Sequence, residues 1–446
     1  MVEKIYSAVM KRSPEAEQSL PPEVQENIAP NGLKQVSAQA LQSSGDQLVN
    51  ASTVLPWLFA ALGVPAALTG LLVPIRESGS MLPQAALTPL VLKVRYRKWI
   101  FVIGSLVQAA SVVAMALVAA VATGLSAGLW IIAALAVFSL GRCLNSISSK
   151  DVLGRTIPKG ERGQINGLST TVGGIVAITV GLAIRVFGGE DLSASAIGWL
   201  LVIGAVLWFG VALIYSTIKE PAGEPFTGDS ANDDDRSGEP ETTGWFSDSI
   251  RLLREDAPFR NFVGVRSLLL VSSLAPPFIV TLSIQHGSAG LAGLGSFILA
   301  SGVARMLGGQ AFGRLADRSS KTVMSVGAGV ASAIVALTVA LTLLPVFSGE
   351  GWAGTALFVA AYFLLTFLHA GVRVGRKTYV VDMAEGDQRT AYVAVSNSAM
   401  GIILLIVGAI SSALAVIHVN WALLFLAAMG IVGVFAGAKL PDVSKG

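Results

Sequence analysis

The chain has 446 residues, of which 53% are hydrophobic and only 13% are charged, with a formal net charge of +3 at pH 7. A soluble domain carries about 25% charged residues, so this composition excludes an ordinary soluble protein and predicts a chain that crosses a membrane many times. Aromatic residues contribute only 7%, which argues against a stacking surface for nucleic acid. The single cysteine, Cys143, excludes an internal disulfide, and with only three histidines we expect neither a metal site nor a cofactor.

The first 37 residues are polar, and they predict a cytoplasmic extension because they lack the apolar core of a signal peptide and contain Pro21-Pro22. Six apolar stretches follow, each long enough to cross a bilayer as a helix. Pro56 is expected to kink the first of them, because proline removes a backbone donor from a helix. The predicted spans of this first bundle, residues 38–218, are 38–62, 66–94, 99–122, 128–150, 165–187 and 196–218.

Residues 219–258 are hydrophilic and predict a cytoplasmic linker, disordered around 222–242 and amphipathic at 246–254. Six more apolar stretches predict a second bundle, residues 259–439, followed by the tail 440–446. Its predicted spans are 260–284, 291–312, 322–346, 352–377, 390–417 and 420–438. Lys and Arg occur in the termini and in one set of loops but in none of the other set, so the positive-inside rule places both termini in the cytoplasm. The sequence thus predicts an all-α integral membrane protein with twelve spans.

A short charged segment, Gly313-Arg314-Leu315-Ala316-Asp317-Arg318-Ser319-Ser320-Lys321, separates the eighth and ninth predicted spans. Gly313 allows two helices to approach closely. Asp317 can accept hydrogen bonds at a neighbouring helix N-terminus, where the helix dipole favours a carboxylate. Arg318 and Lys321 mark the cytoplasmic side. These residues predict a tight, charged connection on the cytoplasmic side of the membrane.

The order Gly-x-Leu-Ala-Asp-Arg in this segment resembles the loop signature of the major facilitator superfamily of secondary transporters. In that family the signature lies between the second and third helices of each half. The resemblance implies two pseudo-symmetric six-helix bundles that rock around a central site and move a small solute. It further implies a monomeric permease of the bacterial plasma membrane in which Gly313, Asp317, Arg318 and Lys321 form a gating loop. The sequence also shows no His/Asp cluster, no paired acids at catalytic spacing and no nucleophile motif, which argues against an enzyme.

An internal repeat supports two matching halves. With an offset of 227 residues, 174–181 aligns with 401–408, and the same offset pairs Lys150 with Lys377. Chance similarity between apolar helices is the alternative, and the basic match upstream reduces its weight. The first-half counterpart of the charged segment, 88–98, has Thr88 in place of the glycine and leucine in place of the aspartate. We therefore expect the two halves to gate unequally.

The fourth span contains Phe138-x-x-x-Arg142-x-x-Asn145, which resembles a facilitator motif whose arginine is implicated in proton transfer. The alternative is an arginine that only extends to the cytoplasmic face, since Arg142 lies about two helical turns from Lys150. The fifth span lacks the Gly-Pro-x-x-Gly-Gly motif of many drug–proton antiporters, which argues against a multidrug antiporter.

Polar and charged residues also lie inside the first and second spans: Asp46, Asn50, Arg76 and Glu77. A charge in the middle of the bilayer costs about 2.5–3.5 kcal/mol even on lenient insertion scales. Adjacent helical residues point about 100° apart, so Arg76 and Glu77 need other partners; Asp46 and Arg142 are the candidates. Two interpretations stay open. The charges form a structural ion pair, or Glu77 or Asp46 takes up a proton as access to the cavity alternates.

The second half adds Arg266, Arg305, His369 and Arg373 within its spans. The intramembrane charge is therefore mainly positive, which favours an anionic or amphiphilic substrate. The alternative is that several of these side chains lie near the cytoplasmic ends and extend into water.

Together these features predict a secondary active transporter of a small solute, embedded in the lipid bilayer, with protons as the coupling ion. The competing hypothesis is a facilitator-like membrane protein that does not transport and acts as an assembly factor or sensor. Such a protein has no need of titratable groups in its cavity, so Asp46, Glu77 and Arg142 weigh against it.

Overall fold

The computed structural model describes residues 22–158, 161–187, 193–222, 245–287, 291–344, 347, 352–383 and 388–443, and residues 3, 6, 7, 12, 17 and 18 of the N-terminal segment. All twelve predicted spans are helical within this part of the chain, and eight helices are long and apolar enough to cross a membrane. The predicted disorder around 222–242 falls almost entirely outside the described residues.

Six spans form the first bundle, in which the first and second spans are each divided into shorter helices. The first span is α4 (Ile28–Leu48) with α5 (Val54–Ala61). The second is η1 (Ala66–Leu68) with α6 (Thr69–Met81) and α7 (Gln84–Leu92). The others are α8 (Lys98–Val121), α9 (Gly124–Thr156), α10 (Arg162–Phe187) and α11 (Ala194–Ser216); a short helix, α3 (Pro22–Gln25), precedes them.

The second bundle repeats this plan after the predicted amphipathic helix of the linker, which is present as α12 (Trp245–Glu255). Its seventh span is again divided, into α13 (Ala257–Leu268) and α14 (Val271–Gln285). The remaining spans are α15 (Leu291–Arg318), α16 (Ser320–Leu341), α17 (Trp352–Met383), α18 (Gln388–Ile417) and α19 (Val419–Ala438).

The first span differs from its prediction in two ways. Its helix begins at Ile28, inside the predicted cytoplasmic extension, because a polar helical segment continues the apolar one beyond the stretch that hydropathy detects. The interruption lies at residues 49–53 and not at Pro56, which occupies the first turn of α5, where a proline removes no intrahelical hydrogen bond. Asn50 stabilises the interruption, since its side-chain Oδ1 accepts a hydrogen bond from the Ser52 backbone N–H at 2.8 Å.

The charged segment between the eighth and ninth spans is not an open loop. Helix α15 continues through residues 313–318, and only Ser319 separates it from α16. Leu and Ala are good helix formers, so the segment extends the helix instead of ending it. The Ser319 side chain caps α16 by accepting a hydrogen bond from the Thr322 N–H at 3.3 Å.

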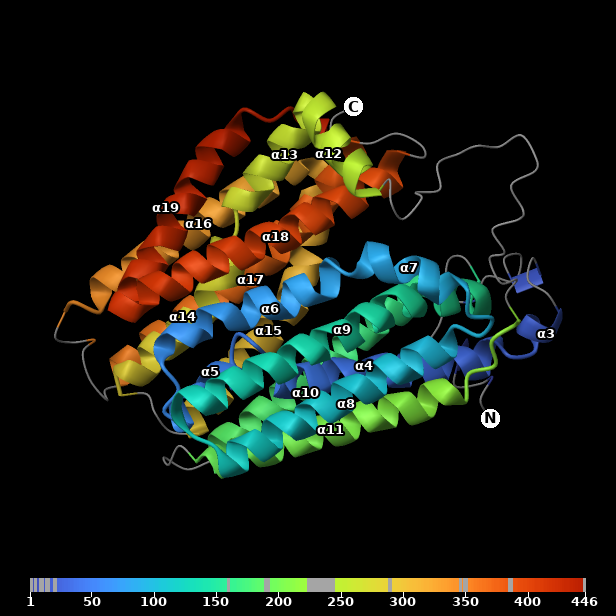
Figure 1. Cartoon of the computed structure of the whole chain (residues 1–446), viewed down its shortest axis with the longest axis horizontal. Coiled ribbons are helices and arrows are strands. Elements are labelled where there is room, and N and C mark those ends of the chain that lie inside the picture. Colours follow the sequence, from blue (N-terminus) through green and yellow to red (C-terminus); the bar gives the residue numbers. More distant parts are fainter. Residues whose placement is uncertain are drawn as a thin grey trace.

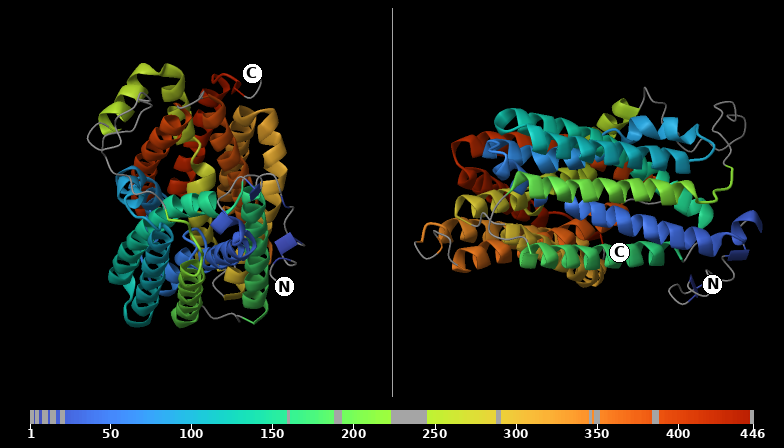
Figure 2. Two further views of the ribbon diagram at one scale, coloured as in Figure 1. Left: turned by 90° about the vertical axis from the view of Figure 1, so that its right-hand side faces the viewer. Right: turned by 90° about the horizontal axis from the view of Figure 1, so that it is seen from below.

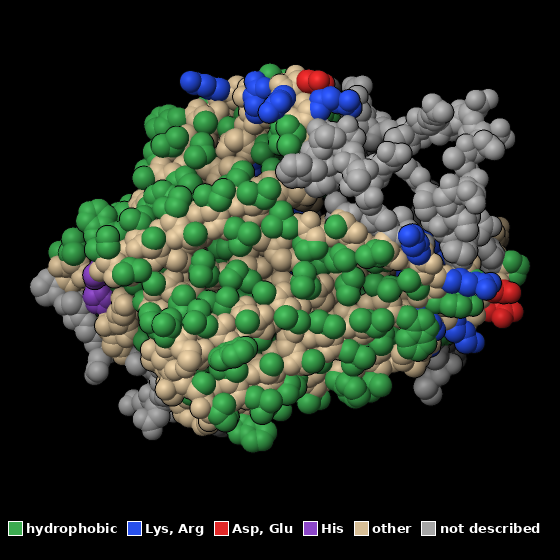
Figure 3. Space-filling view, in the orientation of Figure 1, with side chains coloured by type: hydrophobic (Ala, Val, Ile, Leu, Met, Phe, Trp, Pro, Cys, Tyr) green, Lys and Arg blue, Asp and Glu red, His purple; other side chains and the backbone are tan. Residues whose placement is uncertain are grey.

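The two bundles lie close together at one end of the molecule and diverge toward the other (Figure 1). In the left view of Figure 2 the first bundle, blue to green, lies below the second, yellow to red. Charged side chains gather at the top and right of the surface in Figure 3, while the broad face between is mainly hydrophobic. This distribution fits helices whose middle parts face lipid and whose charged ends face water.

Small residues allow the bundles to approach closely along two seams. In the seam of α10 with α15, a Cβ added to Gly181 would lie 2.5 Å from the backbone nitrogen of Leu299. In the seam of α6 with α18, the Ser78 hydroxyl donates to the Gly401 carbonyl at 2.7 Å. Backbone contact of this kind is how membrane helices associate without a hydrophobic driving force between them.

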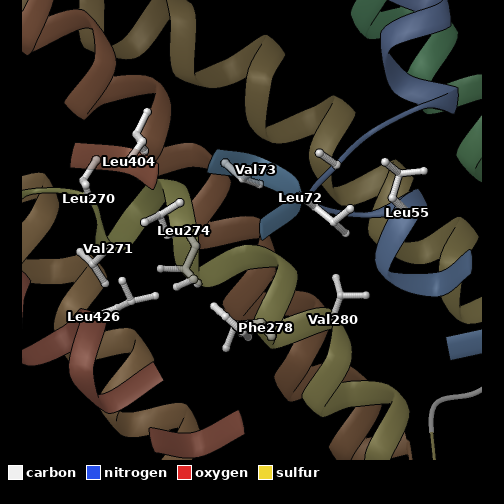
Figure 4. Packing of buried hydrophobic residues seen from close by; sticks show 14 of the residues in the cluster. Leu55, Leu72, Val73, Leu270, Val271, Leu274, Phe278, Val280, Leu404 and Leu426 are labelled. Carbon is white, nitrogen blue, oxygen red and sulfur yellow. The ribbon is translucent and has the colours of Figure 1, made fainter. Parts of the chain in front are cut away.

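An apolar core continues across the junction of the two bundles. Figure 4 shows side chains of α5 and α6 near those of α14, and all of them belong to one buried cluster. Trp57 of the first bundle packs against Phe297 of the second, with ring centroids 6.3 Å apart, and Phe297 contacts Tyr362 edge to face at 5.1 Å. The Thr53 and Tyr362 hydroxyls share a hydrogen bond. These contacts close the end of the molecule that is opposite to the predicted cytoplasmic end.

Polar contacts tie the N-terminal segment and the start of the linker to the first bundle. Tyr6 is buried and donates a hydrogen bond to the Glu161 carboxylate at 2.5 Å. Glu220 follows α11 and accepts hydrogen bonds from the backbone N–H groups of Arg97 (3.2 Å) and Lys98 (2.9 Å), at the start of α8. Burial raises the pKa of Glu220, while the positive end of the α8 dipole favours its carboxylate.

Candidate functional site

A cluster of three charged side chains joins α4, α6 and α9 within the first bundle. Asp46 lies 2.9 Å from Nη2 of Arg76, and its two carboxylate oxygens lie 2.6 and 2.8 Å from Nη1 of Arg142. The Asp46 side chain is 14% exposed and that of Arg142 is 31% exposed, so the cluster lies beside a solvent-accessible space. One carboxylate therefore balances two guanidinium groups.

Of the two pairings proposed from the sequence, that of Arg76 with Asp46 is confirmed. Arg142 pairs with Asp46 and not with Glu77. The reason is helix packing, because α9 places the guanidinium next to the α4 carboxylate. Glu77 lies within electrostatic range of Arg76, Arg142 and Arg376, but among the described side chains it has no ion-pair partner within 4.0 Å.

Asn50 and Asn145, both predicted to line the cavity, have local structural contacts. Asn145 is buried and donates to the Ser105 hydroxyl at 3.0 Å, which fixes α9 against α8. Asn50 holds the interruption between α4 and α5, and its Nδ2 atom is buried without a described hydrogen-bond partner. Asn50 therefore keeps one hydrogen-bond donor unused. Three residues further along the chain, Thr53 contacts Tyr362, and neither of these two residues was predicted to belong to the site.

In the second bundle, Arg266 is buried and donates to Ser396 Oγ at 2.8 Å and to Asn397 Oδ1 at 3.1 Å. These acceptors are neutral, so they satisfy its hydrogen bonds without balancing its charge. His369 Nδ1 lies 3.4 Å from the Ser272 hydroxyl. Arg305 lies within electrostatic range of Asp46, Arg142 and Arg373, so charged side chains of both bundles lie near one another.

Two basic residues of α17, Arg376 and Lys377, are missing from the predicted site. Arg376 is only 8% exposed, and its Nε atom has no described hydrogen-bond partner. The sequence does contain a signal for it, since Arg373 and Arg376 follow His369 by four and seven residues and so share one helix face with it.

The predicted gating loop is only partly described. The surroundings of Gly313 and the side chain of Asp317 are not described, so the gating role of Asp317 stays a prediction. Arg318 is exposed. Lys321 donates to the backbone carbonyls of Ala438 (2.9 Å) and Leu440 (2.5 Å), so it caps the end of α19 within the second bundle.

In the described part of the chain, no group of three or more His, Cys, Asp or Glu side chains is arranged to hold a metal ion. The described charged and polar side chains of this region offer electrostatic interactions and hydrogen bonds. Basic side chains from both bundles face it, and Asp46 and Glu77 are the acidic residues among the described side chains that lie near them.

Comparison with solved structures gives the fold an independent check. A mutant form of the nucleoside transporter NupG superposes with a TM-score of 0.68 at 16% identity, covering 92% of this chain and 99% of that one. The inward-open xylose transporter XylE from E. coli superposes with a TM-score of 0.64 at 11% identity, covering 93% and 97%. A D-xylose–proton symporter gives a TM-score of 0.67 at 13% identity, covering 92% and 98%. At these identities the similarity establishes the fold alone.

No curated protein matches the sequence. The family model of the Major Facilitator Superfamily matches residues 37–353, most of the chain, and it agrees with the twelve helical spans and their two-bundle arrangement. The chain therefore belongs to the Major Facilitator Superfamily of membrane transporters.

Proposed function

We propose that the protein is a secondary active transporter that carries a small anionic solute across the plasma membrane by alternating access, coupled to protons. The observation that carries this proposal is the excess of basic side chains where charged residues of the two bundles approach one another. Arg142, Arg305, Arg373 and Arg376 form a series in which each lies within electrostatic range of the next, and few described carboxylates balance them. A positive cavity attracts anions.

The packing of the two bundles supports alternating access. The seams and the aromatic contact of Trp57 with Phe297 join the bundles at one end, and the bundles diverge toward the other (Figure 1). The basic side chains at the diverging end support a cytoplasmic location for that end by the positive-inside rule. The proposal therefore interprets the structure as an inward-open state with both termini in the cytoplasm.

Glu77 is the stronger candidate for the proton-binding group. Asp46 is held by two guanidinium groups, and protonating it would break both ion pairs. Glu77 has no ion-pair partner among the described side chains, so a change in its charge would break no described salt bridge. Arg376 lies within electrostatic range of Glu77, so a change in the charge of Glu77 alters the electrostatic potential at this basic residue.

The proposal is tested with the purified protein in liposomes. A thermal-shift screen of organic acids, phosphate esters, sugars and nucleosides first identifies compounds that stabilise the native state, because a bound ligand raises the apparent melting temperature. The radiolabelled hit is then supplied with an imposed pH gradient. We expect accumulation above equilibrium that collapses with a protonophore and is absent from empty liposomes.

A sensor or assembly factor predicts a different result. It would bind a ligand or partner without moving solute, so a stabilising ligand that never accumulates in sealed liposomes would contradict the transport proposal. Equal flux with and without the pH gradient would leave transport standing and remove proton coupling.

A further inference from the structure

One face of α17 carries four basic side chains in less than three helical turns: His369, Arg373, Arg376 and Lys377. Their spacing places like charges three and four residues apart, where they repel one another. Arg373 and Lys377 are exposed, and Arg376 is buried. No ion pair joins any of them to a carboxylate among the described side chains.

Among these four residues, Arg376 provides the strongest evidence for a bound ligand. More than nine-tenths of it is buried, and its buried Nε atom has no described hydrogen-bond partner. A buried cation without a partner costs much more than a paired one. Its charged neighbours are Arg373, Lys377 and Arg266, with Glu77 as the acidic group in range.

The first bundle contributes a further positively charged residue, Lys150, to this region. Lys377 lies within electrostatic range of Lys150 on α9. Lys150 belongs to the first bundle and Lys377 to the second, so basic side chains of the two bundles lie near each other. Lys150 is exposed in the inward-open state. Closing the cytoplasmic mouth would bring Lys150 closer to the basic face of α17, and like charges oppose that movement.

We infer that Lys150, Arg373, Arg376 and Lys377 form a binding site for a small anion with at least two negative charges, and that the cytoplasmic mouth closes only when this anion bridges the bundles. The ligand class is a phosphate ester or a di- or tricarboxylate, because both present several oxygens to guanidinium and ammonium groups. This inference rests on the proposed transport function and specifies its substrate.

The site has a consequence for transport. A carrier whose mouth cannot close without an anion returns slowly when empty, so exchange of one anion for another should outrun net flux. A monovalent anion neutralises only one of the facing charges and should close the mouth poorly.

Binding is tested first, with the purified full-length protein. Citrate, pyrophosphate and a sugar phosphate are the probes, and acetate and a neutral sugar are the comparison ligands. We expect each multivalent probe to raise the melting temperature and Arg376→Gln to weaken its binding at least tenfold. Lys439→Gln, which removes an exposed basic residue at the same end of the molecule, serves as the matched control. Equal binding to both variants would overturn the site.

A charge-reversal variant tests whether repulsion between basic side chains keeps the cytoplasmic mouth open. Lys377→Glu places a carboxylate opposite Lys150, so the mouth should close without any anion. Spin labels at Lys93 and Arg254, in a chain with Cys143→Ser, report the distance between the cytoplasmic ends of the bundles. We expect the distance to shorten in Lys377→Glu and to lengthen again when Lys150→Glu is added. An unchanged distance in the single variant, or equal shortening in the double variant, would overturn the closure mechanism.

The two proposals fail separately. Multivalent anions that bind at this site but never cross the membrane would refute the transport function and leave the site. Transport of a neutral solute by a protein that binds none of the anions would refute both the site and the anionic substrate, and would leave only the transport activity.

Discussion

Asp46 and Arg142 are joined by two short contacts, 2.6 and 2.8 Å long, from a single guanidinium nitrogen to both oxygens of one carboxylate. Arg76 adds a third contact of 2.9 Å to the same carboxylate. The three residues come from α4, α6 and α9, so one aspartate holds three helices of the first bundle together. This arrangement makes Asp46 an electrostatic clamp, and for that reason the proposed coupling role is assigned to Glu77.

Asp46→Asn should destabilise the first bundle strongly, because it leaves Arg76 and Arg142 without a compensating negative charge. Breaking a buried pair by removing one partner typically costs about 3–5 kcal/mol. We expect a clear fall in the melting temperature of the purified protein and a lower yield of folded protein. Glu77→Gln is the matched control, since it removes a carboxylate of the same bundle that takes part in no described ion pair. Equal melting temperatures for both variants would show that Asp46 is not a clamp.

Glu77→Gln should abolish proton-driven accumulation while leaving the exchange of internal for external substrate intact. The neutral side chain can no longer alternate between charged and uncharged states, but the basic side chains that bind the solute stay in place. The measurement compares uptake under an imposed pH gradient with counterflow in the absence of a gradient. Uphill transport that is unchanged in the variant would end the coupling role of Glu77.

The number, order and helical nature of the spans could be predicted, because hydropathy and length report them directly. The predicted helix boundaries are wrong where polar residues continue a helix beyond its apolar part. Residues 28–37 and 313–318 are both helical, although their polarity suggested an extension and a loop. The interruption at residues 49–53 was missed because the nearby Pro56 is the stronger sequence signal, yet it falls where a helix tolerates proline.

The candidate site could be predicted only in part. The pairing of Arg76 with Asp46 follows from the rule that an intramembrane charge needs a partner. The partner of Arg142 depends on which of two carboxylates helix packing brings closer, and no local pattern encodes that distance. Arg376 shares a helix face with two predicted site residues, but its burial without a partner becomes visible only in the folded structure. The expectation that Asp317 contributes more to gating than the corresponding segment of the first half stays a prediction.

Gly181→Leu should open the seam of α10 with α15. A side chain at this position meets backbone atoms of Leu299, which cannot move aside as a flexible side chain can. We expect the outer ends of the bundles to separate, and spin labels at the exposed positions Val121 and Leu343 measure that separation. Gly154→Leu is the control, because an added Cβ at Gly154 meets no atom within 4 Å. A larger change in the control than in Gly181→Leu would contradict the role of the seam.

Tyr362→Phe should weaken the closed outer end without disturbing its packing. The ring keeps its edge-to-face contact with Phe297, and only the hydrogen bond to the Thr53 hydroxyl is lost. A hydrogen bond of this kind contributes about 1 kcal/mol net, which corresponds to about a fivefold change in an equilibrium constant. The outer distance between labels at Val121 and Leu343 should therefore show a larger open population in the variant. Thr53→Val removes the same hydrogen bond from the other bundle, so it should produce a similar shift, and the double variant should add little to either. Additive shifts in the double variant would mean that the two hydroxyls act independently and that their contact does not hold the outer end closed.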